Sequence, residues 1–190
     1  KNIPEEKIFL GNGSDEIIDL CYRIFCKPGT NKALTFFPSY GMYEVSASVN
    51  DIEVIKIPLD SRFQINYNEL VPCLSDEKLK LIIICSPNNP TGNCMDRSVV
   101  EKIISAFNGI ILLDEAYIDF ADQPSLKDSI TGYPNLIVMQ TFSKAFGMAS
   151  VRVGMAFTNP EIVQYLNKMK PPYNISTINQ RAVLKRLENP

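Results

Sequence analysis

The chain has 190 residues, of which 45% are hydrophobic and 21% are charged, and its formal net charge is −2. This is the composition of an ordinary globular protein with a sizeable core, and the charge argues against nucleic acid or an anionic membrane as a partner. There is no histidine, which excludes Ser-His-Asp and Cys-His catalysis and any histidine-ligated metal within the chain.

The cysteine pattern and the hydropathy further restrict which kinds of protein this chain can be. Five cysteines without a C-x-x-C spacing indicate neither a disulfide framework nor a zinc site, and they favour a reducing cytoplasm. No apolar run of the sequence approaches the length of a membrane span. We therefore expect a cytoplasmic protein without a metal centre.

Strand-like runs alternate with segments of helical periodicity along the chain. The sequence predicts strands at residues 33–36, 53–57, 81–85, 110–114, 136–140 and 152–157. It predicts helices at residues 15–25, 40–49, 66–74, 96–107, 161–170 and 178–187. This alternation indicates an α/β fold of three layers, α/β/α, with a mostly parallel sheet covered on both faces. We expect a single domain over residues 1–190, and because the chain starts without methionine and stops just after a helical segment, a piece of a longer polypeptide.

Glycines precede the first predicted helix, at Gly11 and Gly13, and Ser14 and Asp15 follow them. We expect Ser14 to be the N-cap. Free backbone N–H groups and the positive end of a helix dipole at such a position suit a phosphate group. An ordinary glycine turn with a helix cap explains the same residues, and taken alone it is the better explanation.

Two loops after predicted strands carry further candidates. Tyr40 comes directly after Pro38-Ser39 and could stack on a flat ring, although a core aromatic is an equal alternative. Residues 86–92 read Ser-Pro-Asn-Asn-Pro-Thr-Gly, where two prolines restrict the loop and Gly92 permits a tight turn. Such a rigid loop could aim the Asn89 amide at a ligand, and a purely structural turn is the alternative.

Asp114 ends a strand that should be buried, where a carboxylate is costly unless it is paired. A cationic ring nitrogen would be a suitable partner, and Tyr117, three residues on, could form a hydrogen bond with an oxygen of the same ring. A loop cap is the alternative for Asp114. We interpret Glu115 as structural.

Lys144 follows the predicted strand at 136–140 within a turn rich in Gly, Ser and Ala. The hydroxyls of Thr141 and Ser143 and the guanidinium of Arg152 are suited to grip a phosphate. A lysine that can form an imine, next to an anion site, is what pyridoxal 5'-phosphate needs. A surface lysine is the alternative, but the strand-end position favours the functional interpretation.

Five runs occur in an order that resembles a known family. They are residues 11–16, 38–43, 86–92, 114–117 and 141–154. In them the chain resembles the pyridoxal-phosphate-dependent aminotransferases of fold type I, and its residues are similar to the large domain of those enzymes. More narrowly, residues 40–43, 114–120 and 170–174 resemble the histidinol-phosphate aminotransferase family. Relatives that act on aromatic amino acids or phosphothreonine share much of the pattern.

The resemblance implies a role for each candidate. Lys144 would form the imine with pyridoxal phosphate and later move the substrate's proton, while Asp114 pairs with the pyridine nitrogen. Asn89 and Tyr117 would hold the phenolate oxygen of the ring, and Tyr40 would stack on the ring. The cofactor phosphate would be bound by the backbone of Ser14 and Asp15 and by the side chains of Thr141, Ser143 and Arg152.

The resemblance also implies the reaction and the partners. It implies a transamination in histidine biosynthesis that couples the pair glutamate/2-oxoglutarate to the pair imidazole-acetol phosphate/histidinol phosphate. It also implies that the enzyme is a homodimer. The family's N-terminal arm and C-terminal small domain have no counterpart in these residues. Another fold type I enzyme or a non-catalytic cofactor-binding fragment is the alternative. A dinucleotide-binding domain is disfavoured because Gly11 and Gly13 lack the third glycine of that fingerprint and follow only a short apolar stretch.

Overall fold

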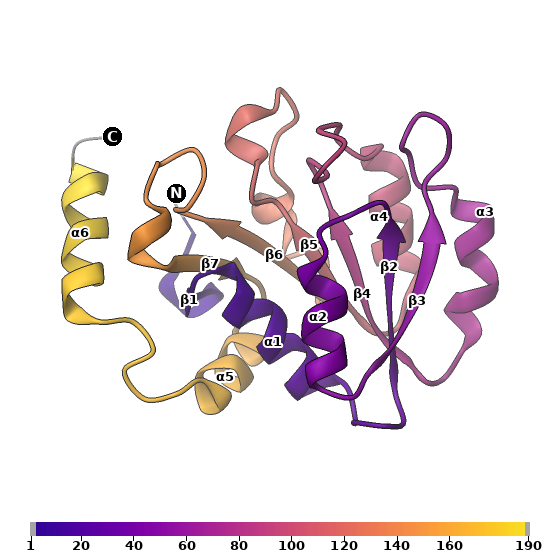
Figure 1. Cartoon of the computed structure of the whole chain (residues 1–190), viewed down its shortest axis with the longest axis horizontal. Helices are drawn as coiled ribbons and strands as arrows, with labels where there is room; N and C mark the ends of the chain where they lie inside the picture. Colours follow the sequence, from indigo (N-terminus) through magenta and orange to yellow (C-terminus); the bar gives the residue numbers. More distant parts are fainter. Residues whose placement is uncertain (1–2, 189–190) are drawn as a thin grey trace.

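A computed structural model describes residues 3–188 of the chain, and these residues form one sheet flanked by helices (Figure 1). The sheet order is β1-β7-β6-β5-β4-β2-β3. The strands are β1 Ile8–Asn12, β2 Lys32–Phe37, β3 Glu53–Pro58, β4 Leu79–Cys85, β5 Ile110–Asp114, β6 Leu136–Thr141 and β7 Val153–Phe157. Strand β7 runs antiparallel to both of its neighbours, β1 and β6, whereas the other neighbouring pairs are parallel, so the expectation of a mostly parallel sheet is confirmed.

The helices cover both faces of the sheet. They are α1 Ser14–Phe25, α2 Met42–Val49, α3 Tyr67–Leu70, α4 Arg97–Ala106, α5 Pro160–Met169 and α6 Thr177–Glu188. Short 3-10 helices lie between them: η1 Glu5–Lys7, η2 Val71–Ser75, η3 Ile118–Phe120, η4 Leu126–Ser129 and η5 Ala149–Val151. In Figure 1, α1, α2 and α5 lie in front of the sheet and α4 lies behind it. Within residues 3–188, no helix combines the length and apolarity needed to cross a membrane.

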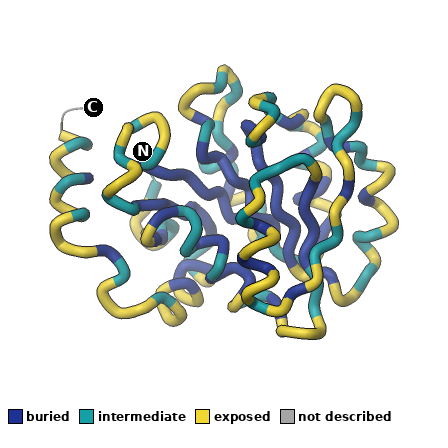
Figure 2. Tube along the Cα trace, viewed as in Figure 1, coloured by how far each residue is buried: buried dark blue, intermediate teal, exposed yellow. Residues whose placement is uncertain are grey.

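Alternating side chains of the central strands build two separate cores. Ile82 of β4 packs with Ile103 of α4 on one face, whereas its neighbour Ile83 packs with Ile17 of α1 on the other. This follows from the pleat, because successive strand residues point to opposite faces. The central strands are therefore buried along most of their length (Figure 2), and the three-layer α/β/α fold is confirmed.

The edge strand β1 was missed by the sequence analysis. Its register pairs Leu10 with Met155 and Gly11 with Gly154 of β7. The strand is short, its exposed and buried residues alternate, and it contains a glycine, so the local strand signal is weak. β1 becomes part of the sheet by pairing with β7, which lies more than 140 residues away in the chain. No local sequence pattern encodes such a pairing.

Three predicted boundaries near the candidate site were wrong. Gly13, not Ser14, is the N-cap of α1: its φ is +78°, no side chain caps the helix, and Ser14 is the first helical residue. Arg152 was expected inside a strand, but its φ of +51° places it in the left-handed region, between η5 and β7. The predicted helix at 40–49 begins later, at Met42, and leaves Tyr40 in the preceding loop.

The prediction of one continuous α-helix at residues 66–74 was also wrong. It is the four-residue α3 followed by the 3-10 helix η2. The Asn66 side chain accepts a hydrogen bond from the Asn68 N–H at the start. Pro72 has no N–H to donate, so an α-helix cannot continue regularly through this segment.

Candidate active site

The predicted site residues lie at one edge of the sheet, where parallel strands end together. Strands β4, β5 and β6 end at Cys85, Asp114 and Thr141, and β1, which runs in the same direction, leads directly into α1. This carboxyl edge is where open α/β sheets bind ligands. In the described part of the chain, no group of three or more His, Cys, Asp or Glu side chains is placed to hold a metal ion.

Asp114 is a buried carboxylate with two hydrogen-bond donors. It is only 4% exposed; Oδ2 accepts from the Tyr43 hydroxyl at 2.7 Å and Oδ1 accepts from the Ala116 N–H at 3.0 Å. Burial raises the pKa of Asp114 to about 6, although both donors act to lower it. No lysine or arginine within residues 3–188 forms an ion pair with it. A carboxylate in this position fits a cationic ring nitrogen of the kind that pyridoxal phosphate carries.

The Lys144 amine lies on the open side of the same edge. Its Nζ is 5.1 Å from the centre of the Tyr117 ring, within the range of a cation–π contact. The Lys144 carbonyl accepts a hydrogen bond from the Gly147 N–H at 2.9 Å, and Gly147 has a φ of +67°, so Lys144 stands in a tight turn. The structure therefore brings Lys144 next to Tyr117, three residues after Asp114.

The other side of the edge is a cluster at the start of α1. Arg152 Nη2 is 3.3 Å from Asp15 Oδ2, and the Tyr40 hydroxyl donates to Asp15 Oδ1 at 3.3 Å. A Cβ atom added to Gly13 would lie 2.4 Å from Arg152 Nη2, so only glycine lets the guanidinium lie over the helix start. The N–H groups of Ser14 and Asp15 are in the first turn, where a helix has no acceptor of its own. Backbone donors and a guanidinium together fit a phosphate.

The two hydroxyl candidates lie in the turn before Lys144. Thr141 is buried; its Oγ1 accepts the Ser143 N–H at 3.1 Å and lies 3.4 Å from the Val153 carbonyl oxygen, to which it donates. The Thr141 hydroxyl therefore stabilises the turn that carries the lysine. Direct contact of Thr141 or Ser143 with a phosphate stays a prediction.

Asn89 is half-buried in its loop, and its neighbour Asn88 proves to be the more connected residue. Asn88 is 3% exposed; its Oδ1 accepts from the Ser39 hydroxyl at 2.9 Å and its Nδ2 donates to the Pro38 carbonyl at 3.0 Å. These bonds join the loop that carries Asn89 to the loop that carries Tyr40. The sequence analysis missed Asn88 because two adjacent amides give no local sign of which one faces inward.

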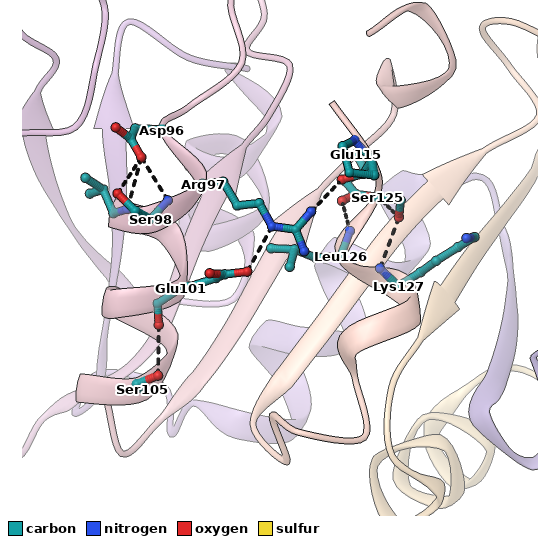
Figure 3. A network of polar contacts seen from close by, with 11 residues as sticks. Asp96, Arg97, Ser98, Glu101, Ser105, Glu115, Ser125, Leu126 and Lys127 are labelled. Carbon is teal, nitrogen blue, oxygen red and sulfur yellow. Dashed lines mark hydrogen bonds and ion pairs between the residues drawn. The ribbon is translucent and has the colours of Figure 1, made fainter. Parts of the chain in front are cut away.

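Glu115 binds the loop that follows β5 (Figure 3). Its Oε1 accepts from the Leu126 N–H at 2.8 Å, and its Oε2 accepts from the Gln140 amide at 2.8 Å and from the Ser125 hydroxyl. Arg97 adds a hydrogen bond to the Pro124 carbonyl of the same loop at 3.1 Å. The buried Glu115 thus holds this loop against β6, in keeping with a structural role.

Comparison with known proteins places this geometry in a family. A family model described as aminotransferase class I and II matches residues 1–190. The chain belongs to this family. The histidinol-phosphate aminotransferases of Cytophaga hutchinsonii and Parabacteroides distasonis are 51% and 49% identical to this aminotransferase chain over 189 residues. Both comparisons cover 100% of the chain and 54% of the relative, so the chain spans about half the length of the curated relatives it matches.

A solved structure agrees with the fold of this aminotransferase chain. The crystal structure of the histidinol-phosphate aminotransferase from Clostridium acetobutylicum matches with a TM-score of 0.86 and 30% identity, covering 96% of this chain and 55% of that one. The aminotransferase fold that the motifs implied is therefore confirmed.

Proposed function

We propose that this chain is the cofactor-binding domain, residues 1–190, of a longer pyridoxal-phosphate-dependent enzyme, and that the complete protein is a histidinol-phosphate aminotransferase. The observation that carries the proposal is the buried Asp114 carboxylate, which no described lysine or arginine neutralises. The exposed Lys144 amine lies beside the Tyr117 ring, and Tyr117 is three residues after Asp114 in the chain. Relatives about half identical over the whole chain support the choice of substrate.

Each predicted residue has a task in this proposal. Pyridoxal 5'-phosphate, when bound, supplies a ring that accepts electrons from the substrate's α-carbon. Asp114 would hold the ring nitrogen in its charged form, and Asn89 and Tyr117 would donate hydrogen bonds to the ring oxygen. Tyr40 would pack on the ring. The Lys144 amine would hold the cofactor and would move the proton at the substrate's α-carbon, the work of a general acid and base.

The phosphate end of the cofactor is assigned to the cluster at the start of α1. The binding groups are the backbone N–H of Ser14 and Asp15 and the side chains of Thr141, Ser143 and Arg152. In the present structure Arg152 pairs with Asp15, so binding of a phosphate exchanges one anionic partner of the guanidinium for another.

We further propose that the complete protein moves an amino group from glutamate to imidazole-acetol phosphate. The products are 2-oxoglutarate and histidinol phosphate. The groups that bind the substrate's carboxylate and phosphate are expected in the part of the longer protein that these residues do not cover. A homodimer and a cytoplasmic location belong to the same proposal, and light scattering of the purified protein tests the first.

The direct test is reduction of the full-length protein with borohydride in the presence of pyridoxal phosphate, followed by peptide mass spectrometry. We expect a pyridoxyl group on Lys144 and loss of all transamination in Lys144→Ala. Lys168→Ala is the matched control, because Lys168 also lies over a tyrosine ring, at 5.7 Å from its centre, but on the exposed face of helix α5. Label on Lys168 or elsewhere, or near-normal turnover by Lys144→Ala, would refute the assignment.

A substrate panel tests the narrower part of the proposal. Imidazole-acetol phosphate, aromatic 2-oxo acids and phosphothreonine are offered to the full-length protein with glutamate as donor where one is needed. Preference for imidazole-acetol phosphate supports the histidinol-phosphate assignment. Preference for either of the others moves the protein to a neighbouring branch of the family while leaving the role of Lys144 intact.

A further inference from the structure

Tyr43 is a buried residue directly behind the candidate site to which no role has been assigned above. It lies in the first turn of α2, is 0% exposed, and donates its hydroxyl to Asp114 Oδ2 at 2.7 Å. The two residues are 71 positions apart in the chain. Because Oδ1 is held by the Ala116 N–H, each carboxylate oxygen has one donor and the group is fixed in orientation.

Tyr43 is itself held in place from two sides. The Tyr22 hydroxyl of α1 donates to the Tyr43 carbonyl at 2.9 Å. The Tyr40 ring meets the Tyr43 ring edge-on, with centres 5.5 Å apart and an interplanar angle of 87°. Burial raises the pKa of Tyr43 well above its ordinary value, so the hydroxyl keeps its proton and remains a donor to Asp114. Tyr43 thus contacts Tyr40, α1 and Asp114 at the same time.

Apart from its two hydrogen-bond donors, the surroundings of Asp114 raise its pKa. The titratable neighbours are Asp15, Tyr40, Tyr43, Cys85 and Glu115. Asp15 and Glu115 are acids that disfavour a further negative charge, as burial does. Burial raises the pKa of the Cys85 thiol to about 12, so this thiol is neutral and does not stabilise the charge. Among the described residues, the Tyr43 hydroxyl and the Ala116 N–H are the groups that favour the ionised form of Asp114.

We propose that Tyr43 is a positioning residue whose hydroxyl keeps the Asp114 carboxylate ionised and correctly oriented, ready for a cationic ring nitrogen. The hydrogen bond stands on the geometry alone, whereas the ring it prepares for rests on the proposed function. Tyr43 acts through Asp114 and, in the described structure, makes its polar contact with that side chain rather than with the open site.

The first test is the titration of Asp114 in cofactor-free, full-length protein carrying ¹³C-labelled aspartate, with Asp114→Asn to assign the signal. A hydrogen bond to a charged group is worth one to two pKa units, so Tyr43→Phe should move the midpoint upward by roughly that amount. Thr158→Val is the matched control, because it removes an equally buried hydroxyl whose partner is the Leu136 carbonyl and which contacts neither Asp114 nor Tyr43. An unchanged midpoint in folded Tyr43→Phe overturns the proposal.

A second variant tests the same hydrogen bond in the opposite direction. Replacing Tyr43 site-specifically with 3-fluorotyrosine keeps the ring and the hydroxyl but makes the hydroxyl a stronger donor. We expect the Asp114 midpoint to move downward. This variant keeps the proposal testable if Tyr43→Phe does not fold, and an upward shift or no shift would contradict it.

The pH profile of pyridoxal phosphate affinity separates positioning from a merely structural role. In the wild type, affinity should fall as the pH drops through the Asp114 midpoint. In Tyr43→Phe the fall should come roughly one to two pH units higher, with affinity recovered at alkaline pH. An affinity loss that is the same at every pH overturns the proposal. Failure of the wild type to take the cofactor on Lys144 counts against the proposed function alone, since the titration of Asp114 decides on Tyr43 without it.

Discussion

At the scale of single residues, Asp114 shows a conflict between stability and binding. Its carboxylate is buried at a strand end without a cationic partner among the described residues, which raises its pKa from an ordinary 3.8 to about 6. The folded state therefore holds a proton that the unfolded chain has already released between these values. Asp114 thus stabilises the cofactor-free fold most below pH 3.8, and that contribution is lost as the pH rises through about 6.

This loss of stability with rising pH predicts the effect of Asp114→Asn. Relative to the wild type, the variant should gain about 3 kcal/mol in the free energy of unfolding between pH 4 and pH 7, because asparagine does not titrate. Urea unfolding of the cofactor-free protein at several pH values measures it. Asp119→Asn, an exposed change in the 3-10 helix η3 that follows, should show the same pH dependence of stability as the wild type. Parallel curves for Asp114→Asn as well would show that the carboxylate is not desolvated.

The sequence placed the candidate residues at or just past strand ends. The structure brings Lys144 beside Tyr117 and Tyr40 beside Asp15 at that edge of the sheet, and the cofactor roles of these residues stay predictions. Asn88 and Tyr43 were missed. Their importance lies in partners about 50 and 71 positions away, and such contacts exist only after the chain has folded.

At the scale of elements, the site depends on how closely the start of α1 approaches β7. Gly154 of β7 pairs with Gly11 of β1, and a Cβ atom on Gly154 would lie 2.6 Å from the Gly13 carbonyl carbon and 2.7 Å from the Ser14 nitrogen. Both neighbours are backbone atoms, of the N-cap and of the first helical residue, and they cannot move independently of α1. Gly154 therefore lets the start of α1 lie close enough to β7 for the Arg152 guanidinium to lie over it.

Gly154→Ala should force that helix start away from the sheet. We expect a loss of about 1–3 kcal/mol in the free energy of unfolding and weaker binding of pyridoxal phosphate by full-length protein. Gly41→Ala is the control: its added Cβ meets nothing within 4 Å and its φ of −62° suits alanine, so stability should be unchanged or slightly higher. Chemical unfolding and fluorescence titration measure both. Equal behaviour of the two variants would contradict the close-approach argument.

Which elements were predictable follows from the strength of their local signal. Buried strands such as β5 and β6 are continuous apolar runs, and their predicted positions agree with the structure to within one residue. The short α3 was predicted too long because Pro72 was given too little weight, and β1 was missed because it is short and two of its five residues are exposed. Local pattern is weakest where an element is short or lies at an edge.

At the scale of the whole molecule, α6 is the least anchored helix. Its buried side chain is Val183, whereas Ile178, Leu184 and Leu187 are exposed. A groove of about 1060 Å³ lies between this helix and the β1–β7 edge, lined largely by apolar side chains. In Figure 1 the helix stands at the side of the sheet, away from α1. Few apolar contacts mean a low local free energy of opening.

Hydrogen exchange should show this difference. In the 190-residue chain we expect α6 amides to exchange at least roughly 100-fold faster than those of α1, which buries five side chains against the sheet and the neighbouring helices. Exchange followed by mass spectrometry gives both values in one experiment. Equal protection of α6 and α1 would mean that the groove closes in solution.

The sequence by itself determined the fold class, the core strands and the identity of most candidate site residues. Apolar runs, glycines and prolines act within a few residues of themselves, so these features can be read locally. The tertiary structure alone decided that β1 joins β7, that Arg152 adopts a left-handed backbone next to Gly13, and that Tyr43 supports Asp114. These depend on close approach between segments far apart in the chain, and only packing of the whole sheet and its helices sets those distances.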